Sequence, residues 1–196
     1  MTIREATGVD LAAIDDIYNH YVHSSTSTFQ VDPTTPEERR IWYAAHGPDH
    51  PVLVYEDSAH DSAQDEAAAP RTSPRSGPRV AGGRIAGWAS LNRYNPREAY
   101  GRTVELSVYV RDDRRGSGIG RALLGELLAH AKKVGHHVVL AQVSADQEPS
   151  LALHRSFGFR EVGRLREVGF KFGRWLDVVV FDLVITTART GDTRAA

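Results

Sequence analysis

One stretch constrains the fold of this chain more than any other: VYVRDDRRGSGIGRALLGELLAHAKKVG, from Val108 to Gly135. A run of β-forming residues meets a charged turn, and alternating glycines follow at Gly116, Gly118 and Gly120. Apolar residues then recur at helical spacing from Gly118 to Val134. The stretch therefore predicts a strand, a glycine loop and a helix in succession, as in a domain whose helices pack on a sheet.

The glycine loop has the features of an anion-binding site. Backbone amides at the start of a helix lack partners and carry partial positive charge. Glycine lets such amides approach a phosphate closely, and Arg115 and Arg121 add charged donors on either side. The P-loop pattern GxxxxGK[ST] is absent, and the spacing Gly116-x-Gly118-x-Gly120 does not fit the dinucleotide pattern GxGxxG. A phosphate loop and a purely structural helix cap both remain open on these residues alone.

The rest of the chain alternates between helical and strand patterns. Thr7 with Asp10, and Thr35 with Glu38, have the spacing of capping boxes at helix starts. Helices are expected over 7–22, 35–47, 118–134 and 149–158, and strands over 2–6, 51–56, 84–94, 103–110 and 136–144, with two more over 159–185 that turn near Gly173. This order predicts an α/β (α+β) fold, a mixed sheet with helices packed on it.

Two segments lack the apolar residues that a core needs. Residues 57–82 are rich in Ser, Ala, Pro, Gly and charged residues, and such a segment buries too little to offset its ordering entropy. We expect a flexible insert there, either a tolerated surface loop or a lid. Residues 187–196 are expected to form a disordered tail, which leaves a single domain over residues 1–186.

Composition excludes several classes of protein. The 196 residues contain 24 Lys and Arg against 25 Asp and Glu, with no basic run, so no nucleic-acid partner is expected. The absence of cysteine rules out disulfides, thiolate metal sites and a cysteine nucleophile. No apolar run approaches the ~20 residues that span a bilayer, and the charged N-terminus is unlike a signal peptide. We expect a cytoplasmic protein with no membrane partner.

Several motifs occur together in a familiar order. Arg115-x-x-Gly118-x-Gly120 resembles the pyrophosphate loop of the GCN5-related N-acetyltransferases (GNAT superfamily). The flanking segments IYNHYV…TSTF, AYGRTVELSVYV, PSLALHRSFGF and GFKFGRWLDV are similar to those of one branch, the phosphinothricin and methionine sulfone or sulfoximine N-acetyltransferases. The resemblance covers residues 2–185 except the expected insert.

The resemblance implies a mixed, mostly antiparallel sheet of about seven strands with about four flanking helices. It also implies that the parallel strands 103–110 and 137–144 splay apart and hold acetyl-CoA, the co-substrate, between them. It further implies a homodimer in which the partner chain helps to close the acceptor pocket. The main chain of Val108, Tyr109 and Val110 would pair with the pantetheine arm. The pyrophosphate would be wrapped by Arg115, Gly116, Ser117, Gly118, Ile119, Gly120 and Arg121.

Acetylation of an amine needs a proton acceptor, because an α-amino group has a pKa of about 8 in water. Glu105 alternates away from Val104 and Leu106, so it points off the apolar face of its strand. The resemblance makes Glu105 the general base, whereas its position alone also fits a glutamate on a solvated sheet face. His154 matches a histidine of the branch and would relay protons or touch the substrate, or would serve packing alone. With no cysteine, direct attack of the amine on the thioester is the simpler scheme.

The acceptor pocket is expected to combine aromatic and cationic groups. Phe29, Arg97 and Tyr100 match branch positions that line it, and a guanidinium suits a carboxylate or phosphinate. Lys171 is a second candidate cation, or a structural feature of the last hairpin. Gln147 stands where the branch usually has Asn, and its amide is expected to contact pantetheine.

No metal site is expected. His20-x-x-His23 and His136-His137 lack a carboxylate at ligand spacing. The sequence therefore predicts an acetyl-CoA-dependent N-acetyltransferase whose acceptor is a small amino acid such as phosphinothricin, methionine sulfoximine or methionine sulfone. Two alternatives remain: acetylation of another small amine, and a non-catalytic acyl-CoA-binding sensor.

Overall fold

The computed structural model describes residues 2–58 and 83–185. The expected tail, 187–196, lies outside the described residues, as does the expected insert apart from its first two residues. Those two residues, Asp57 and Ser58, extend a strand that pairs Ser58 with Gly83, so at this end the expected boundary of the insert is two residues too early.

Within residues 2–58 and 83–185 the sheet has seven strands, in the order β1-β2-β3-β4-β5-β7-β6. Every neighbouring pair is antiparallel except β4 and β5, which are parallel. The strands are β1 (Thr2–Glu5), β2 (Val52–Ser58), β3 (Gly83–Arg93), β4 (Thr103–Val110), β5 (Val138–Ser144), β6 (Arg160–Lys171) and β7 (Arg174–Val184). The predicted mixed, mostly antiparallel sheet is confirmed.

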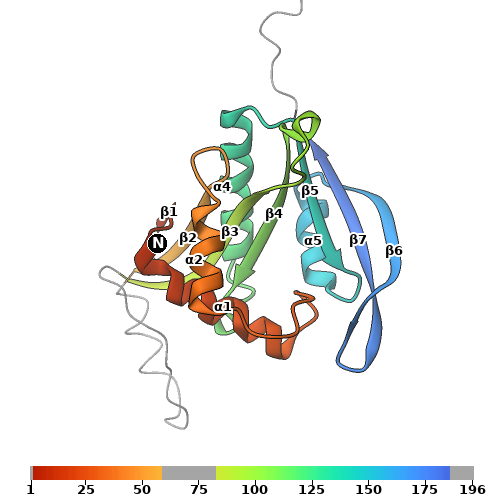
Figure 1. Cartoon of the computed structure of the whole chain (residues 1–196), viewed down its shortest axis with the longest axis horizontal. Coiled ribbons are helices and arrows are strands. Elements are labelled where there is room, and N and C mark those ends of the chain that lie inside the picture. Colours follow the sequence, from red (N-terminus) through yellow and green to blue (C-terminus); the bar gives the residue numbers. More distant parts are fainter. Residues whose placement is uncertain (1, 59–82, 186–196) are drawn as a thin grey trace, which may run out of the picture.

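In the part of the chain that the structure describes, four α-helices cover the two faces of this sheet (Figure 1). They are α1 (Leu11–Ser24), α2 (Pro36–Ala44), α4 (Ile119–Val134) and α5 (Glu148–Ser156). Buried residues of α4 and α5 share a core with β2–β5 and β7, while α1 and α2 pack with Val52, Val54 and Trp88 on the other face. Alternate residues of each central strand therefore enter different cores, as the two-residue period of a strand requires.

Both predicted capping boxes form. Thr35 accepts a hydrogen bond from the Glu38 amide at 3.2 Å, and Glu38 accepts one from the Thr35 amide at 2.8 Å. Asp10 accepts from the Thr7 amide at 2.8 Å, but the turn that it closes, Gly8–Asp10, is a 3₁₀ helix that precedes α1. The first α-helix thus begins later than its apolar pattern indicated, because the Asp10 amide donates to the Thr7 carbonyl three residues back, at 3.0 Å, as in a 3₁₀ turn.

The parallel pair β4 and β5 separates soon after it begins. Register partners exist only at Thr103–Val138, Val104–Val139 and Glu105–Leu140. Beyond Glu105 the two strands have no register partners on each other, and Figure 1 shows them diverging. The predicted splay is thus present, and Glu105 lies at the point where pairing stops.

A glycine on β3 sets the position of α4. A Cβ atom on Gly87 would lie 2.9 Å from the Tyr109 carbonyl oxygen and 3.1 Å from side-chain atoms of Ile119 and Leu123. Because Gly87 lacks this atom, the first turn of α4 packs closely on β3 and β4. The helix start is thereby held beside the opening of the splayed pair.

Candidate active site

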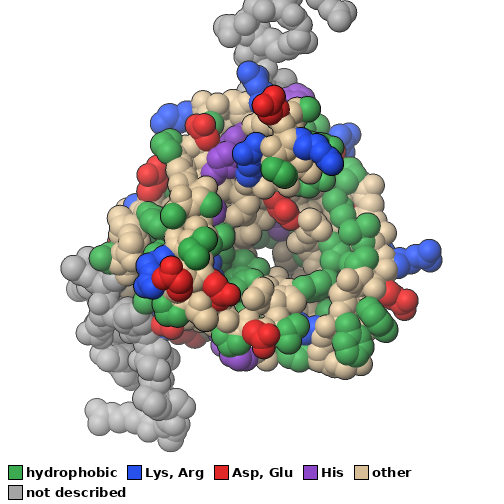
Figure 2. All heavy atoms as spheres, in the orientation of Figure 1, with side chains coloured by type: hydrophobic (Ala, Val, Ile, Leu, Met, Phe, Trp, Pro, Cys, Tyr) green, Lys and Arg blue, Asp and Glu red, His purple; other side chains and the backbone are tan. Residues whose placement is uncertain are grey.

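A cavity of about 620 Å³ opens where β4 and β5 diverge. Figure 2 shows the molecule hollowed near the centre of the view, over the gap between these strands in Figure 1. Thirteen of the residues predicted for the site line the cavity: Phe29, Glu105, Val108, Tyr109, Val110, Arg115, Gly116, Gly118, Ile119, Gly120, Arg121, Gln147 and His154. The sequence patterns therefore converge on one place in the fold.

The glycine loop forms one wall of this cavity. Gly116 and Gly118 have φ angles of 75° and 85°, in the left-handed region that favours glycine, and a Cβ on either would meet nothing within 4 Å. Gly118 is the N-cap of α4 and supplies no side-chain cap, so the first-turn amides of the helix have no helical acceptors. Open space, unpartnered amides and positive partial charge together suit a phosphate.

The two arginines of this loop line the cavity, whereas its serine does not. Arg115 lies over the Tyr21 ring, 5.6 Å from its centroid, and Arg121 lies over the Phe157 ring at 5.1 Å. Both arginines line the cavity. Ser117 does not line it, because its hydroxyl donates to the Arg114 carbonyl at 2.6 Å. The serine hydroxyl therefore serves the turn, and any contact of Ser117 with a phosphate would come from its backbone.

The β4 backbone forms the opposite wall. Val108, Tyr109 and Val110 line the cavity on the stretch that β5 no longer pairs. On its other edge β4 pairs with β3 from Val104 to Val110. The Val110 carbonyl also accepts a hydrogen bond from the Tyr21 hydroxyl at 2.5 Å. One edge of β4 thus remains available for a ligand that pairs like a strand.

Glu105 lies between these walls, at the last register position of the parallel pair. Burial raises the pKa of its carboxyl group, and a hydrogen bond from the Gln142 side-chain amide, 3.0 Å from Oε1, opposes that rise. Gln142 belongs to β5 and also lines the cavity. The carboxylate is therefore half-buried with one neutral donor, an arrangement that favours proton uptake more than a solvated surface would.

His154 is buried beside the same cavity. Its Nδ1 lies 2.8 Å from the Ser150 carbonyl oxygen, which can only accept, so Nδ1 carries the proton. Burial lowers the pKa of the imidazole, which favours the neutral ring. The ring is stacked on Phe181 with centroids 5.8 Å apart, and its Nε2 has no hydrogen-bond partner among the described residues. This geometry supports the packing alternative, and a role in proton transfer stays a prediction.

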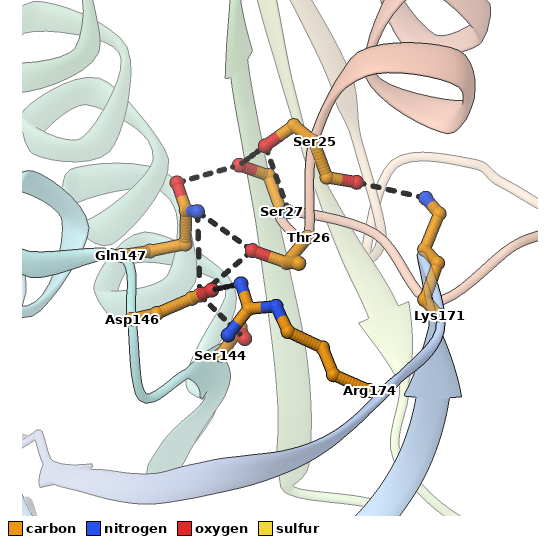
Figure 3. Close-up of polar contacts among 8 residues, drawn as sticks. All are labelled: Ser25, Thr26, Ser27, Ser144, Asp146, Gln147, Lys171 and Arg174. Carbon is orange, nitrogen blue, oxygen red and sulfur yellow. Dashed lines mark hydrogen bonds and ion pairs between the residues drawn. The ribbon is translucent and has the colours of Figure 1, made fainter.

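The loop between α1 and α2, residues 25–35, is tied to the far end of β5 and to β7 (Figure 3). Asp146 accepts hydrogen bonds from Thr26 at 2.7 Å and Ser144 at 2.9 Å, and it pairs with Arg174. Burial alone would raise the pKa of Asp146, but these donors outweigh it and hold the pKa at about 2. The carboxylate therefore stays charged and fixes the loop at neutral pH.

Gln147 takes part in the same network. Its Oε1 accepts from Ser27 at 3.0 Å, and its Nε2 donates to Thr26 at 2.7 Å. The longer stem of glutamine thus reaches the α1–α2 loop while the residue lines the cavity. A pantetheine contact of Gln147 stays a prediction, and in this geometry it would compete with the loop for the amide.

Lys171 does not line the cavity. Its ammonium donates to the carbonyls of Ser25 and Thr28 at 2.8 Å each, and to that of Tyr21 at 3.5 Å. Three acceptors match the three donors of an ammonium group. This geometry favours the structural alternative for Lys171: it pins the α1–α2 loop to β6.

Arg97 and Tyr100 also lie outside the lining of the cavity. Arg97 is the N-cap of the short 3₁₀ helix Glu98–Tyr100, and it is exposed. The Tyr100 ring packs on Tyr94 with centroids 5.5 Å apart. Within this chain neither residue lines the cavity that holds Glu105, whereas Phe29 does.

Sequence reasoning did not single out Gln142, Asp146 or Arg174. Gln142 had a signal, because it is a polar residue inside the apolar strand VVLAQVS, two residues from the register partner of Glu105. Asp146 and Arg174 had none, because the contacts that tie them to the α1–α2 loop and to each other join residues 120 and 28 positions apart. Among the described residues no cluster of His, Asp or Glu could hold a metal ion, and no helix is long and apolar enough to cross a membrane.

Known proteins resemble this chain in both sequence and structure. A methionine sulfoximine/methionine sulfone acetyltransferase of Pseudomonas paraeruginosa is 35% identical over 190 residues, which cover 96% of this chain and 97% of the relative. A phosphinothricin N-acetyltransferase of Streptomyces coelicolor is 36% identical over 182 residues, 92% of this chain and 94% of the relative.

Among solved structures, a GNAT superfamily phosphinothricin acetyltransferase of Sinorhizobium meliloti, in complex with acetyl-CoA, superposes with a TM-score of 0.79. It is 30% identical, and the match covers 94% of this chain and 88% of that one. The sequence model of the acetyltransferase (GNAT) family matches residues 14–159. The cavity between the splayed strands thus lies in a chain that belongs to the acetyltransferase (GNAT) family.

Proposed function

We propose that this protein transfers the acetyl group of acetyl-CoA to the amino group of a small amino acid. The first acceptors to test are methionine sulfone, methionine sulfoximine and phosphinothricin. The names of the relatives support the reaction and these acceptors. The observation that carries the proposal is the position of Glu105, a half-buried carboxylate at the point where β4 and β5 part.

The residues that would hold the co-substrate fit its chemistry. The first-turn amides of α4, with Arg115 and Arg121, offer positive charge to a diphosphate. The free edge of β4 from Val108 to Val110 offers backbone donors and acceptors to the amide groups of a pantetheine arm. Acetyl-CoA would supply a thioester whose carbonyl carbon the acceptor amine attacks.

Glu105 would act as the general base. It accepts the proton that the amine loses, directly or through a water molecule, so that the nitrogen keeps a lone pair for bond formation. Burial raises the pKa of this carboxyl group, which makes it a better proton acceptor, and the hydrogen bond from the Gln142 amide limits the rise. His154 lines the same cavity. In the reaction it would contact the substrate or relay a proton.

The test is Glu105→Gln, which keeps the shape of the side chain and removes the base. We expect turnover to fall by about 10²–10⁴-fold, the usual contribution of general-base catalysis, with acetyl-CoA binding unchanged. Glu126→Gln, an exposed glutamate on α4, is the matched control and should retain full activity. Thiol release is measured over a panel of amino acids across the pH range, and acetyl-CoA affinity by calorimetry.

The outcomes separate the alternatives. Unchanged turnover of Glu105→Gln across the pH range would refute the role of the glutamate. Thiol release with other amines, but not with the three amino acids, would point to a different small acceptor. Tight coenzyme A binding without thiol release for any amine would favour the acyl-CoA sensor.

We further propose that the protein forms a homodimer through its last hairpin. Exposed apolar side chains gather there, on the edge strand β6, in the turn that follows it and at the start of β7: Val162, Leu165, Val168, Phe170, Phe172 and Trp175. An exposed apolar edge of this kind is typical of an interface. Arg97 and Tyr100, which this chain leaves outside the cavity, would then reach an acceptor only if the assembled dimer brings them close to one.

A further inference from the structure

The strand β6 carries an irregularity where it passes the α1–α2 loop. Its register with β7 shifts between Leu165 and Gly169. Within this break Glu167 has a φ of 52°, and its amide donates to the Asp177 carboxylate at 2.9 Å. The strand resumes regular pairing at Gly169, opposite Leu176. The bulge therefore sets which residue of β6 faces the loop.

The residue that faces the loop has no side chain, and an aromatic ring occupies the space. A Cβ atom on Gly169 would lie 2.2 Å from Cε2 of Phe29 and 2.4 Å from its Cδ2. Real Cβ atoms do not come this close to other heavy atoms, so any side chain at position 169 would force the ring to move.

Contacts of the α1–α2 loop oppose a displacement of the Phe29 backbone. Lys171, two residues beyond Gly169 on the same strand, binds the carbonyls of Ser25 and Thr28 at 2.8 Å. Thr26 is bound to Asp146 at 2.7 Å on the other side of the loop (Figure 3). The loop is thus held through its backbone by Lys171 and through the Thr26 hydroxyl by Asp146, so rotation of the Phe29 side chain is the easiest response.

The direction of that rotation matters because Phe29 lines the same cavity as Glu105. The ring has the β6 backbone against one edge, and an added methyl group there would push it away from the strand, toward the cavity that it lines. An acceptor that reaches Glu105 through this cavity passes the wall to which Phe29 contributes, so the position of the ring sets the space left for it.

We propose that Gly169 is a specificity-determining residue: by leaving room for the Phe29 ring against β6, it keeps the acceptor end of the cavity wide enough for an amino acid with a long side chain. Gly169 contacts no substrate itself and acts only through the ring. The inference rests on the proposed acetyl transfer for its kinetic readout, but the contact between Gly169 and Phe29 does not.

The test is Gly169→Ala, with Gly163→Ala as the matched control. Both glycines lie in β6 without a left-handed φ, but a Cβ at 163 would meet nothing within 4 Å. We expect Gly169→Ala to raise the KM for methionine sulfone by about tenfold or more, as for a methylene misplaced in an apolar pocket, with the KM for acetyl-CoA unchanged. Gly163→Ala should match the wild-type protein in both constants.

A double-mutant cycle and a crystal structure separate this effect from a general loss of fold. In a Phe29→Ala background no ring remains to be displaced, so adding Gly169→Ala should change the KM for methionine sulfone little. The crystal structure of Gly169→Ala should have the Phe29 ring turned into the cavity.

Equal KM values for the two glycine variants, or a ring that turns away from the cavity in the crystal, would overturn the inference. If the wild-type protein acetylates no amino acid, the proposed function fails, and the ring position in the Gly169→Ala crystal still decides whether Gly169 sets the shape of the cavity.

Discussion

Glu105 is subject to two opposing influences, and one of them comes from a single neutral side chain. Burial raises the pKa of its carboxyl group, and the Gln142 amide lowers it by donating to the charged form. Its register partners are Asn92 on β3 and Leu140 on β5, and the Asn92 side chain donates to the Ser107 hydroxyl. His154 lines the same cavity, and burial lowers the pKa of its imidazole. Arg115 and Arg121 lie at the glycine loop, along the cavity from Glu105.

Gln142→Leu should therefore move the pH dependence of the reaction. Loss of the donor raises the pKa of Glu105 further, so the base is protonated up to a higher pH, and the acid limb of kcat/KM shifts to higher pH. On that limb we expect kcat/KM to fall by about three- to tenfold, with little change on the alkaline side, because one exposed hydrogen bond to a charged group is lost. The measurement is the pH profile of kcat/KM.

Gln142→Glu extends the same series. A like charge at this position disfavours the ionised form of Glu105. The acid limb of the kcat/KM profile of Gln142→Glu should therefore lie at higher pH than that of Gln142→Leu. Profiles that coincide for wild type and Gln142→Leu would mean that Gln142 has no influence on the base, even if Glu105→Gln has lost its activity.

At the scale of elements, the α1–α2 loop depends on Asp146. The folded pKa of this carboxyl group, about 2, lies below its ordinary value of 3.8, so its stabilising effect is fully present above about pH 4 and is lost as the pH falls toward 2. Asp146→Ala leaves Thr26 and Ser144 without their acceptor and removes the ion pair with Arg174.

We expect Asp146→Ala to lower the Tm by about 2–8 °C at pH 7. The difference from wild type should shrink as the pH is lowered toward 2, and thermal unfolding followed by circular dichroism checks both statements. Glu37→Ala, which breaks the exposed ion pair with Arg40, is the control and should change the Tm little. A pH-independent difference for Asp146→Ala would contradict the role of its charge.

Features of single elements could be predicted from the sequence, whereas contacts between distant elements could not. The glycine loop, the capping boxes and the outward position of Glu105 depend on residues a few positions apart, so local patterns indicate them. The contact of Thr26 with Asp146 joins residues 120 positions apart, and that of Lys171 with Thr28 joins residues 143 apart. No local pattern encodes such contacts, which explains why Lys171 could be read as a pocket cation and why the role of Gly169 was not visible.

For the whole molecule, the last hairpin determines the proposed assembly. Trp175 is 61% exposed and packs edge-on against Phe170, with ring centroids 5.1 Å apart. Trp175→Glu places a charge in the proposed interface and should convert a dimer to a monomer, because an unpaired charge is costly to bury. Sedimentation velocity or light scattering measures the change.

The control for this prediction is Val9→Glu. Val9 is 70% exposed and lies in the 3₁₀ turn before α1, away from the hairpin, so this variant should keep the oligomeric state of the wild type. A wild-type protein that is monomeric at micromolar concentration, or a Trp175→Glu variant that remains dimeric, would contradict the assembly through this hairpin.

The early parting of β4 and β5 has a consequence for how such a protein can change over time. From Leu106 to Val110 the peptide groups of β4 have no register partner on β5, and every residue type except proline supplies both a donor and an acceptor there. Substitutions along this strand therefore alter the shape of the wall without removing its hydrogen-bonding groups. A lineage that keeps this opening is free to exchange the side chains around the acceptor and so to acquire new acceptors on an unchanged frame.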